Sequence, residues 1–449
     1  MPENNLQRKL GLFPATNIVI ANMIGAGIFT TSGLLMSGLN NPLLMLALWV
    51  TGGIIALCGA LSYGELGAAM PGAGGEYLFL SRLYHPVFGF LSGWVSFLVG
   101  FSAPIAASAM GFSEYFCRAL PVIPGWFESS GIMGPVATRK FLSIAVIIIF
   151  TVIHYRGIKS GALIQNVLTI LKVSLIVFLL LAGFLSGRGD ISHFSSGGGV
   201  SAGFAGWKTI GLSLMWIMFA YSGWNASTYI GGEIKNPLKT LPRSLIYGTG
   251  IVIFLYVSIN ILYIYGIKPQ QMKGVISIGG LAMGNLFGKS AEILFSLLIA
   301  FALFSSLSAF IIIGPRVYYS MAKDGLFFKS VARIHPKFQA PSNSIILQCI
   351  IAVILALSGT FDQILTYMGF ALGIFPILTV SGVFKQRRDN PSALRLAGYP
   401  FTQILYLIAG VSILFLSFLE RPVESSIATC TVLIGIPAYY LFRKTQVKS

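Results

Sequence analysis

The chain has 449 residues; 55% of them are hydrophobic, only 10% are charged, and the formal net charge is +17. This composition excludes a soluble globular protein and predicts an all-α polytopic membrane protein surrounded by the lipid bilayer. The positive charge does not predict a nucleic-acid partner, because the basic residues lie in short segments between apolar runs, where they set membrane topology.

Twelve apolar runs predict twelve membrane-spanning helices, since a crossing needs about 20 residues. In chain order the runs cover about 14–38, 42–67, 86–117, 138–155, 161–185, 205–235, 242–266, 290–322, 343–358, 363–384, 401–419 and 423–442. The first run is expected to be a retained span rather than a signal peptide, because it lacks a small-residue cleavage site. Residues 1–449 are therefore expected to form one transmembrane domain.

The order and charge of these spans predict a topology. Lys and Arg are more than twice as frequent on the side that carries the N-terminus as on the opposite side. This bias predicts cytoplasmic termini, in a protein of the plasma membrane or cell inner membrane. Residues 14–185 and 205–384 each hold five spans, start on opposite sides and open on an interrupted helix, so they are expected to form an inverted repeat. The spans at 401–419 and 423–442 fall outside it.

The first interruption lies at the centre of the first span, between Met23 and Phe29. Gly25 and Gly27 allow non-helical backbone there, and unwound backbone inside a membrane persists only where it is buried in protein or lines a cavity. The half-helix that restarts at Ile28 presents free N–H groups, which suit a carboxylate. The alternative is a glycine-lined packing face between helices.

Three charged residues stand out in the first half of the chain. Glu65 and Glu76 flank the segment between the second and third spans and are expected to be solvated or to set topology. Lys172 lies about 20 Å along a helix from Lys159, near the middle of the fifth span. A cation at that depth is costly, which predicts a functional role and a side chain that faces the bundle interior. The alternative is a structural lysine satisfied by backbone carbonyls.

The second interruption, from Phe219 to Asn225, divides the sixth span. A half-helix that ends near Ser222 leaves free carbonyls, which suit an ammonium group. Phe219 is large enough to cover such a site, and the Asn225 amide can donate and accept hydrogen bonds. The alternative is an aromatic packing cluster around a kink. Paired interruptions, one in each half of the chain, are the sequence pointer to a transporter's substrate site.

Ser305, Ser306 and Ser308 lie within the eighth span. Their hydroxyls either bond the first or fifth span or return to carbonyls of their own helix. The histidines and the four scattered cysteines lack metal-ligand spacing, and the chain contains no nucleophile or phosphate-binding motif. We therefore expect no enzymatic activity, no metal and no cofactor.

Several motifs together resemble the amino acid–polyamine–organocation superfamily, and within it most closely the L-type amino acid transporter family and its bacterial relatives. The resemblance covers nearly the whole chain. The motifs that carry it are Ile24-Gly25-Ala26-Gly27-Ile28-Phe29, Pro71-Gly72-Ala73-Gly74-Gly75-Glu76-Tyr77, Phe219 through Asn225, Glu233-Ile234-Lys235-Asn236-Pro237, Pro315-Arg316 and Met321-Ala322-Lys323-Asp324-Gly325. The resemblance implies the LeuT-type fold, with five-plus-five inverted repeats and broken first and sixth helices.

The resemblance also implies roles for individual residues. The backbone around Ala26 and Gly27 would receive the carboxylate of an amino acid. The amino group would be received by the carbonyls of Met23, Ile24, Phe219, Ala220 and Ser222. Phe219 matches the family's outer gate, and Lys172 matches the lysine that takes the place of a sodium ion in sodium-coupled relatives.

Three departures from the family pattern matter. Ala26 replaces a serine that often stands in the first break, so one hydroxyl contact to the carboxylate is lost. Residues 118–140 contain no cysteine, so a covalent glycoprotein partner like that of the animal members is not expected. The sequence places no anionic residue at the break between Phe219 and Asn225, which argues against a basic amino acid as the main substrate.

We therefore expect a sodium-independent secondary transporter of neutral L-amino acids that works by alternating access and exchange. The alternatives are a proton-coupled amino acid symporter, a transporter of another amine such as a polyamine and, less in keeping with the sequence, a channel or sensor on the same fold. The sequence leaves open which amino acid is carried, whether exchange or proton coupling drives it, the oligomeric state and the protonation state of Lys172.

Overall fold

The structure, a computed structural model, describes residues 8, 10–72, 74–155, 161–199, 203–333, 335, 342–391 and 394–447. These ranges are helical, and their β-structure is limited to one isolated bridge between Leu10 and Ile234. Ten helical segments of the described ranges are long and apolar enough to cross a membrane. The all-helical, polytopic membrane architecture is therefore confirmed, whereas twelve spans and the five-plus-five repeat stay predictions.

The first half of the described chain contains nine α-helices and one short π-helix. Their bounds are α1 Leu12–Met23, α2 Ala26–Leu39, α3 Pro42–Ala69, α4 Glu76–Leu83, α5 Pro86–Val95, η1 Ser96–Gly100, α6 Ser102–Ala119, α7 Val122–Ser129, α8 Pro135–Tyr155 and α9 Gly161–Leu185. The first span is formed by α1 and α2, the second by α3, and the third by α5, η1 and α6 together.

The second half of the described chain contains further helical elements of varied length. Its elements are η2 Ile191–Phe194, α10 Phe204–Ala220, α11 Ala226–Tyr229, η3 Gly231–Glu233, α12 Pro237–Gly266, α13 Pro269–Met272, α14 Ile278–Phe287, α15 Lys289–Lys323, η4 Lys329–Ala332, α16 Ser342–Ser358, α17 Phe361–Asp389, α18 Phe401–Glu420 and α19 Pro422–Val447. The helices α10 and α16 lie on two of the predicted spans but are shorter than the ten.

Local chemistry explains where several helices begin. Pro42, Pro86 and Pro237 occupy the first turn of α3, α5 and α12, where a missing N–H costs no helical hydrogen bond. The Asn41 side chain caps α3 by accepting from the Leu44 N–H. These starts fix where each long helix enters the bundle.

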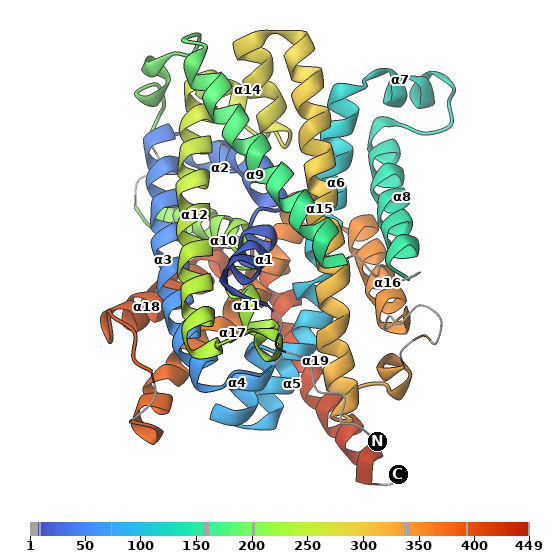
Figure 1. The fold of residues 1–449 in the computed structure, drawn as a ribbon. Coiled ribbons are helices and arrows are strands. Elements are labelled where there is room, and N and C mark those ends of the chain that lie inside the picture. Colours follow the sequence, from blue (N-terminus) through green and yellow to red (C-terminus); the bar gives the residue numbers. More distant parts are fainter. Residues whose placement is uncertain are drawn as a thin grey trace.

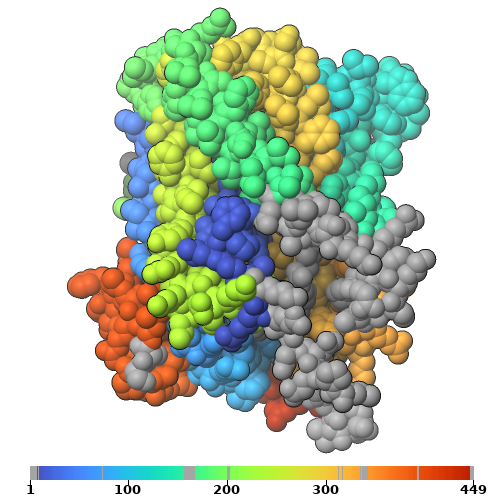
Figure 2. Space-filling view, viewed as in Figure 1, coloured from blue at the N-terminus to red at the C-terminus, as the bar shows by residue number. Residues whose placement is uncertain are grey.

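The long helices stand side by side; α4 and the end of α19 lie at one end of the bundle, and α7 and α14 lie at the other (Figure 1). The α1–α2 span is central, since 89% of its most apolar stretch is buried, compared with 22% for α18. In Figure 2 the beginning of the described chain (dark blue) nevertheless reaches the surface beside α12 (yellow-green), where Phe13 is exposed. The interrupted first span therefore runs from the surface at that end into the interior.

Both predicted interruptions are confirmed. Ile24 and Gly25 are non-helical between α1 and α2, and a series of turns separates α10 from α11. The new half-helix begins at Ala26, two residues earlier than expected. The two breaks touch: Gly223 has a φ of +98°, and a Cβ there would lie 2.8 Å from the backbone of Asn22. Glycine is therefore required at position 223 by both conformation and space.

Candidate functional site

A cavity of about 120 Å³ lies beside the second break. Phe219, Ser222 and Asn225, three of the residues expected to bind substrate, line it. Asn22 is the residue of α1 on its wall, and Glu76, the first residue of α4, also lines it. Helix α4 lies at the end of the bundle where α19 ends (Figure 1). The cavity thus joins the unwound segment of the sixth predicted span to α4.

The first break is packed rather than open to this cavity. Ile24 and Ala26 are buried, and neither they nor Gly25 and Gly27 line the cavity wall. A Cβ on Gly27 would lie 2.6 Å from the Cα and Cβ atoms of Ala220. In this conformation the backbone predicted to hold a carboxylate is in contact with α10.

The carbonyls of the first break already have partners. Ile24 O accepts from Lys172 Nζ at 2.6 Å and from Ser306 Oγ at 3.0 Å. Met23 O accepts from the Gly25 N–H at 2.8 Å and from the Tyr256 hydroxyl at 2.6 Å. A carbonyl oxygen has two lone pairs, so neither is free to receive an amino group here. The carbonyls of the second break are therefore the better candidates to bind an amino group.

Tyr256 on α12 joins the two breaks, and sequence reasoning missed it. Its hydroxyl lies 2.6 Å from Met23 O and 3.1 Å from Ala220 O, the carbonyls near the ends of α1 and α10. The side chain is fully buried between Trp49 and Tyr221. The available signal was a tyrosine inside an apolar span, because a buried phenol needs a hydrogen-bond partner.

Lys172 faces the bundle interior, as predicted, and is 1% exposed. Its ammonium donates to Ile24 O and, at 2.8 Å, to Ser306 Oγ on α15. It therefore connects α9, the first break and α15. Of the serines predicted as partners in this helix, Ser306 makes the contact.

Ser305 and Ser308 do not take part, which corrects their expected role. The Ser305 hydroxyl has no hydrogen-bond partner among the described residues, and Ser308 bonds the His154 ring at 3.0 Å. The reason is the helical period: Ser305 and Ser308 are three residues apart and share a face of α15, whereas Ser306 points in another direction. Only the Ser306 direction meets Lys172.

Glu76 is buried, not solvated as expected, and is 7% exposed. Its Oε1 accepts from the Tyr63 hydroxyl at 2.7 Å and from Asn225 Nδ2 at 2.9 Å, and its Oε2 accepts from the Ser92 hydroxyl at 3.3 Å. A carboxyl group therefore stands at the second break. The sequence argument that no anionic residue lies there is wrong, because the break recruits Glu76 from α4, 149 residues away.

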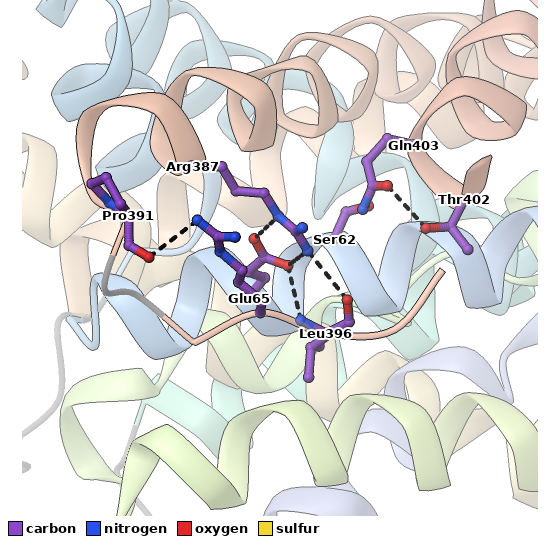
Figure 3. Close-up of polar contacts among 8 residues, drawn as sticks. Ser62, Glu65, Arg387, Pro391, Leu396, Thr402 and Gln403 are labelled. Atoms are coloured by element: carbon purple, nitrogen blue, oxygen red, sulfur yellow. Dashed lines mark hydrogen bonds and ion pairs between the residues drawn. The ribbon is translucent and has the colours of Figure 1, made fainter. Parts of the chain in front are cut away.

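Glu65 is also buried rather than solvated, but it has a cationic partner (Figure 3). Arg387 on α17 donates to both of its oxygens, at 2.6 and 2.7 Å, and the Leu396 N–H donates at 3.1 Å. The Arg387 guanidinium also lies over the Tyr399 ring, 3.9 Å from its centroid. This clasp ties α3 to α17 and to the segment before α18, away from the cavity.

The two glycines of the first break should respond differently to alanine. Gly27→Ala would place a methyl group against Ala220, and overpacking of this kind costs about 1–3 kcal/mol. A Cβ on Gly25 would meet only Met23 O, at 3.9 Å, so Gly25→Ala should fold normally. Thermal unfolding of the two variants in detergent checks this contrast. Equal loss of stability would contradict the close approach of α2 to α10.

The fold and the interrupted helices define a polytopic membrane protein built around an internal cavity. The amino acid permease family model matches residues 10–436, and the chain belongs to this family. The predicted superfamily is thereby confirmed. The family consists of transporters, so the expectation that the protein is not an enzyme is confirmed as well.

Individual relatives are similar over nearly the whole chain. The serine/threonine exchanger SteT of Bacillus subtilis is 28% identical over 99% of both chains. The b(0,+)-type amino acid transporter 1 of Mus musculus is 26% identical over 98% of this chain and 88% of its own. The Asc-type amino acid transporter 1 of Mus musculus is 26% identical over 97% of this chain and 81% of its own.

Proposed function

We propose that the protein carries neutral L-amino acids across the plasma or cell inner membrane, independently of sodium and by exchange. Amino acid transport itself has the broadest support, because the family and the named relatives are amino acid permeases, exchangers and transporters. The observation that carries the finer proposal is the meeting of two broken helices, with Lys172 bonded to one of them.

The substrate would bind between the two breaks as α2 and α10 separate. The N–H groups of Ala26 and Gly27 lie at the start of α2, and such a helix start attracts a carboxylate. The amino group would bind the carbonyls of Phe219, Ala220 and Ser222, since those of Met23 and Ile24 are engaged. The Phe219 ring, which lines the cavity, would act as the gate. Alternating access then moves one set of helices against the other around this point.

The position of Lys172 supports sodium independence. A sodium ion at such a place would coordinate a carbonyl oxygen of the unwound helix. Here the Lys172 ammonium donates to that oxygen, Ile24 O, directly. The charge is thus part of the protein and needs no ion from solution. We propose that Lys172 serves as this substitute on a LeuT-type scaffold of twelve helices with cytoplasmic termini.

The alternatives differ in what Glu76 does. A permanently charged Glu76 at the second break would favour an amine or polyamine, and a Glu76 whose proton crosses the membrane with each substrate would give proton-coupled symport. Neutral substrates are preferred because all three described hydrogen-bond partners of the carboxyl are protein groups. Residues 118–140 offer no cysteine for a covalent glycoprotein partner, so we propose that the chain works without one. A channel or sensor remains the remotest alternative.

Uptake into proteoliposomes tests the proposal. Radiolabelled neutral amino acids should enter vesicles that contain unlabelled amino acid at least several-fold faster than empty vesicles, and replacing sodium with choline should change nothing. Unlabelled arginine and lysine should compete poorly, because an unpaired cation near the middle of a membrane costs roughly 2.5–3.5 kcal/mol on insertion scales. A strong sodium requirement would refute the role of Lys172, and arginine competing as well as alanine would refute neutral selectivity.

A further inference from the structure

Glu76 differs from the other buried carboxyl in its surroundings. Glu65 has Arg387, whereas the described hydrogen-bond partners of Glu76 are Tyr63, Ser92 and Asn225, all neutral. Burying a carboxylate with no opposite charge is costly, and such a group tends to take up a proton instead. The Glu76 carboxyl also lines the cavity, so a proton can reach it from water there.

The partners of Glu76 suit both charge states. In the charged form Oε1 accepts from the Tyr63 hydroxyl and the Asn225 amide, and Oε2 accepts from the Ser92 hydroxyl. In the protonated form Oε1 keeps both of its donors, while an O–H on Oε2 donates to Ser92 Oγ, since a hydroxyl can also accept. Only the Ser92 hydroxyl hydrogen has to turn for the proton to bind or leave, and no heavy atom needs to move.

The titratable groups that face the Glu76 carboxyl are tyrosines, so Glu76 is the group of this cluster that changes charge near neutral pH. Tyr63 reaches it from α3, Tyr229 from α11 and Tyr406 from α18, and all are neutral phenols near pH 7. Cys58 interacts electrostatically with Tyr406 and not with Glu76 directly. Asp324, which directly follows α15, accepts a hydrogen bond from Tyr77, the residue next to Glu76 in sequence. Burial raises the pKa of Glu76 from its ordinary value to about 7, although the hydrogen bonds from Tyr63, Ser92 and Asn225 oppose the shift.

We propose that Glu76 is a proton-binding site that controls the second break, so that amino acid transport depends on the pH at the end of the bundle where α4 lies and α19 ends. The proposal rests on the proposed function. On deprotonation the O–H bond of the carboxyl breaks and the proton passes to water in the cavity. The carboxylate then holds Asn225 more strongly, because hydrogen bonds to ionised groups are about twice as strong as neutral ones.

This strengthened bond selects a conformation. Asn225 ends the unwound segment, and Glu76 fixes it to α3 through Tyr63 and to α5 through Ser92. The charged form therefore stabilises the arrangement seen here, in which the cavity lies open between the second break and α4. Protonation weakens the link and frees the segment to move. A coupling of this strength changes the balance of conformations about five- to tenfold.

The test compares wild type with Glu76→Gln, which keeps the shape and hydrogen bonds of the protonated form. Exchange in proteoliposomes should change about five- to tenfold between about pH 6 and pH 8 in wild type, because Glu76 titrates within this window. Glu76→Gln should show a flat profile at the level of the acidic plateau. Glu128→Gln, which alters an exposed carboxyl on α7 at the opposite end of the bundle, should titrate like wild type.

A second measurement separates this inference from the proposed function. Infrared difference spectra of the purified protein should show the C=O band of a protonated carboxylic acid that vanishes as pH rises through neutrality and is absent in Glu76→Gln. That band supports the inference even if no amino acid is transported. An unchanged pH profile in folded Glu76→Gln, or no such band, would overturn it. So would loss of lysine uptake with an unaltered pH profile for alanine, since Glu76 would then bind a cationic substrate.

Discussion

Lys172→Met should lower amino acid affinity about ten- to a hundredfold while leaving the protein as stable as wild type or more so. The affinity falls because the charged hydrogen bond to Ile24 O, worth about 1.5–3 kcal/mol, no longer holds the first break in place. Stability does not fall, because Ser306 still donates to Ile24 O, and replacing a buried charge by an apolar group is often neutral or stabilising. Equilibrium binding of a labelled amino acid, with thermal unfolding of the same sample, measures both effects.

Two adjacent serines provide matched controls for this prediction. Ser306→Ala removes the hydroxyl that contacts both Lys172 and Ile24, so it should weaken affinity in the same direction but less. Ser305→Ala removes a hydroxyl with no described partner and should leave affinity unchanged. If Lys172→Met instead lowers the melting temperature and preserves affinity, Lys172 is a structural lysine, as the competing interpretation holds.

The features that sequence alone predicted are those governed by local chemistry. Gly25 and Gly27 in an apolar run, and Ser222 through Asn225 in another, favour an interrupted helix, and both interruptions are present. The sequence predicts that Lys172 faces the interior, because a cation exposed to lipid at that depth is costly. These inferences need only the residue, its neighbours and the thickness of the membrane.

The features that sequence alone missed depend on contacts between distant segments. Glu76 and Glu65 look alike in sequence, but one meets Asn225 and the other meets Arg387, 322 residues away. Likewise, Ser305 and Ser306 are indistinguishable until the rotation of α15 is known. Periodicity assigns a residue to one face of a helix, but it does not say which element packs on that face.

The same contrast between buried and exposed charges yields the last prediction, at the clasp in Figure 3. Arg387→Gln should destabilise the protein by about 3–5 kcal/mol, because it leaves the Glu65 carboxylate, which is 1% exposed, without its cation. Arg388→Gln is the matched control: the Arg388 side chain is 77% exposed and its ion pair among the described residues is with Asp389, so its loss should have almost no effect.

Thermal unfolding in detergent measures both variants, and a double variant shows the cause. Adding Glu65→Gln to Arg387→Gln removes the stranded charge, so it should recover part of the lost stability, since breaking a buried pair costs more than removing both charges. If the double variant is instead less stable than Arg387→Gln alone, the loss comes from packing of the Arg387 side chain against Tyr399, 3.9 Å from the guanidinium carbon to the ring centroid. The ion pair would then not be what holds α3 to α17.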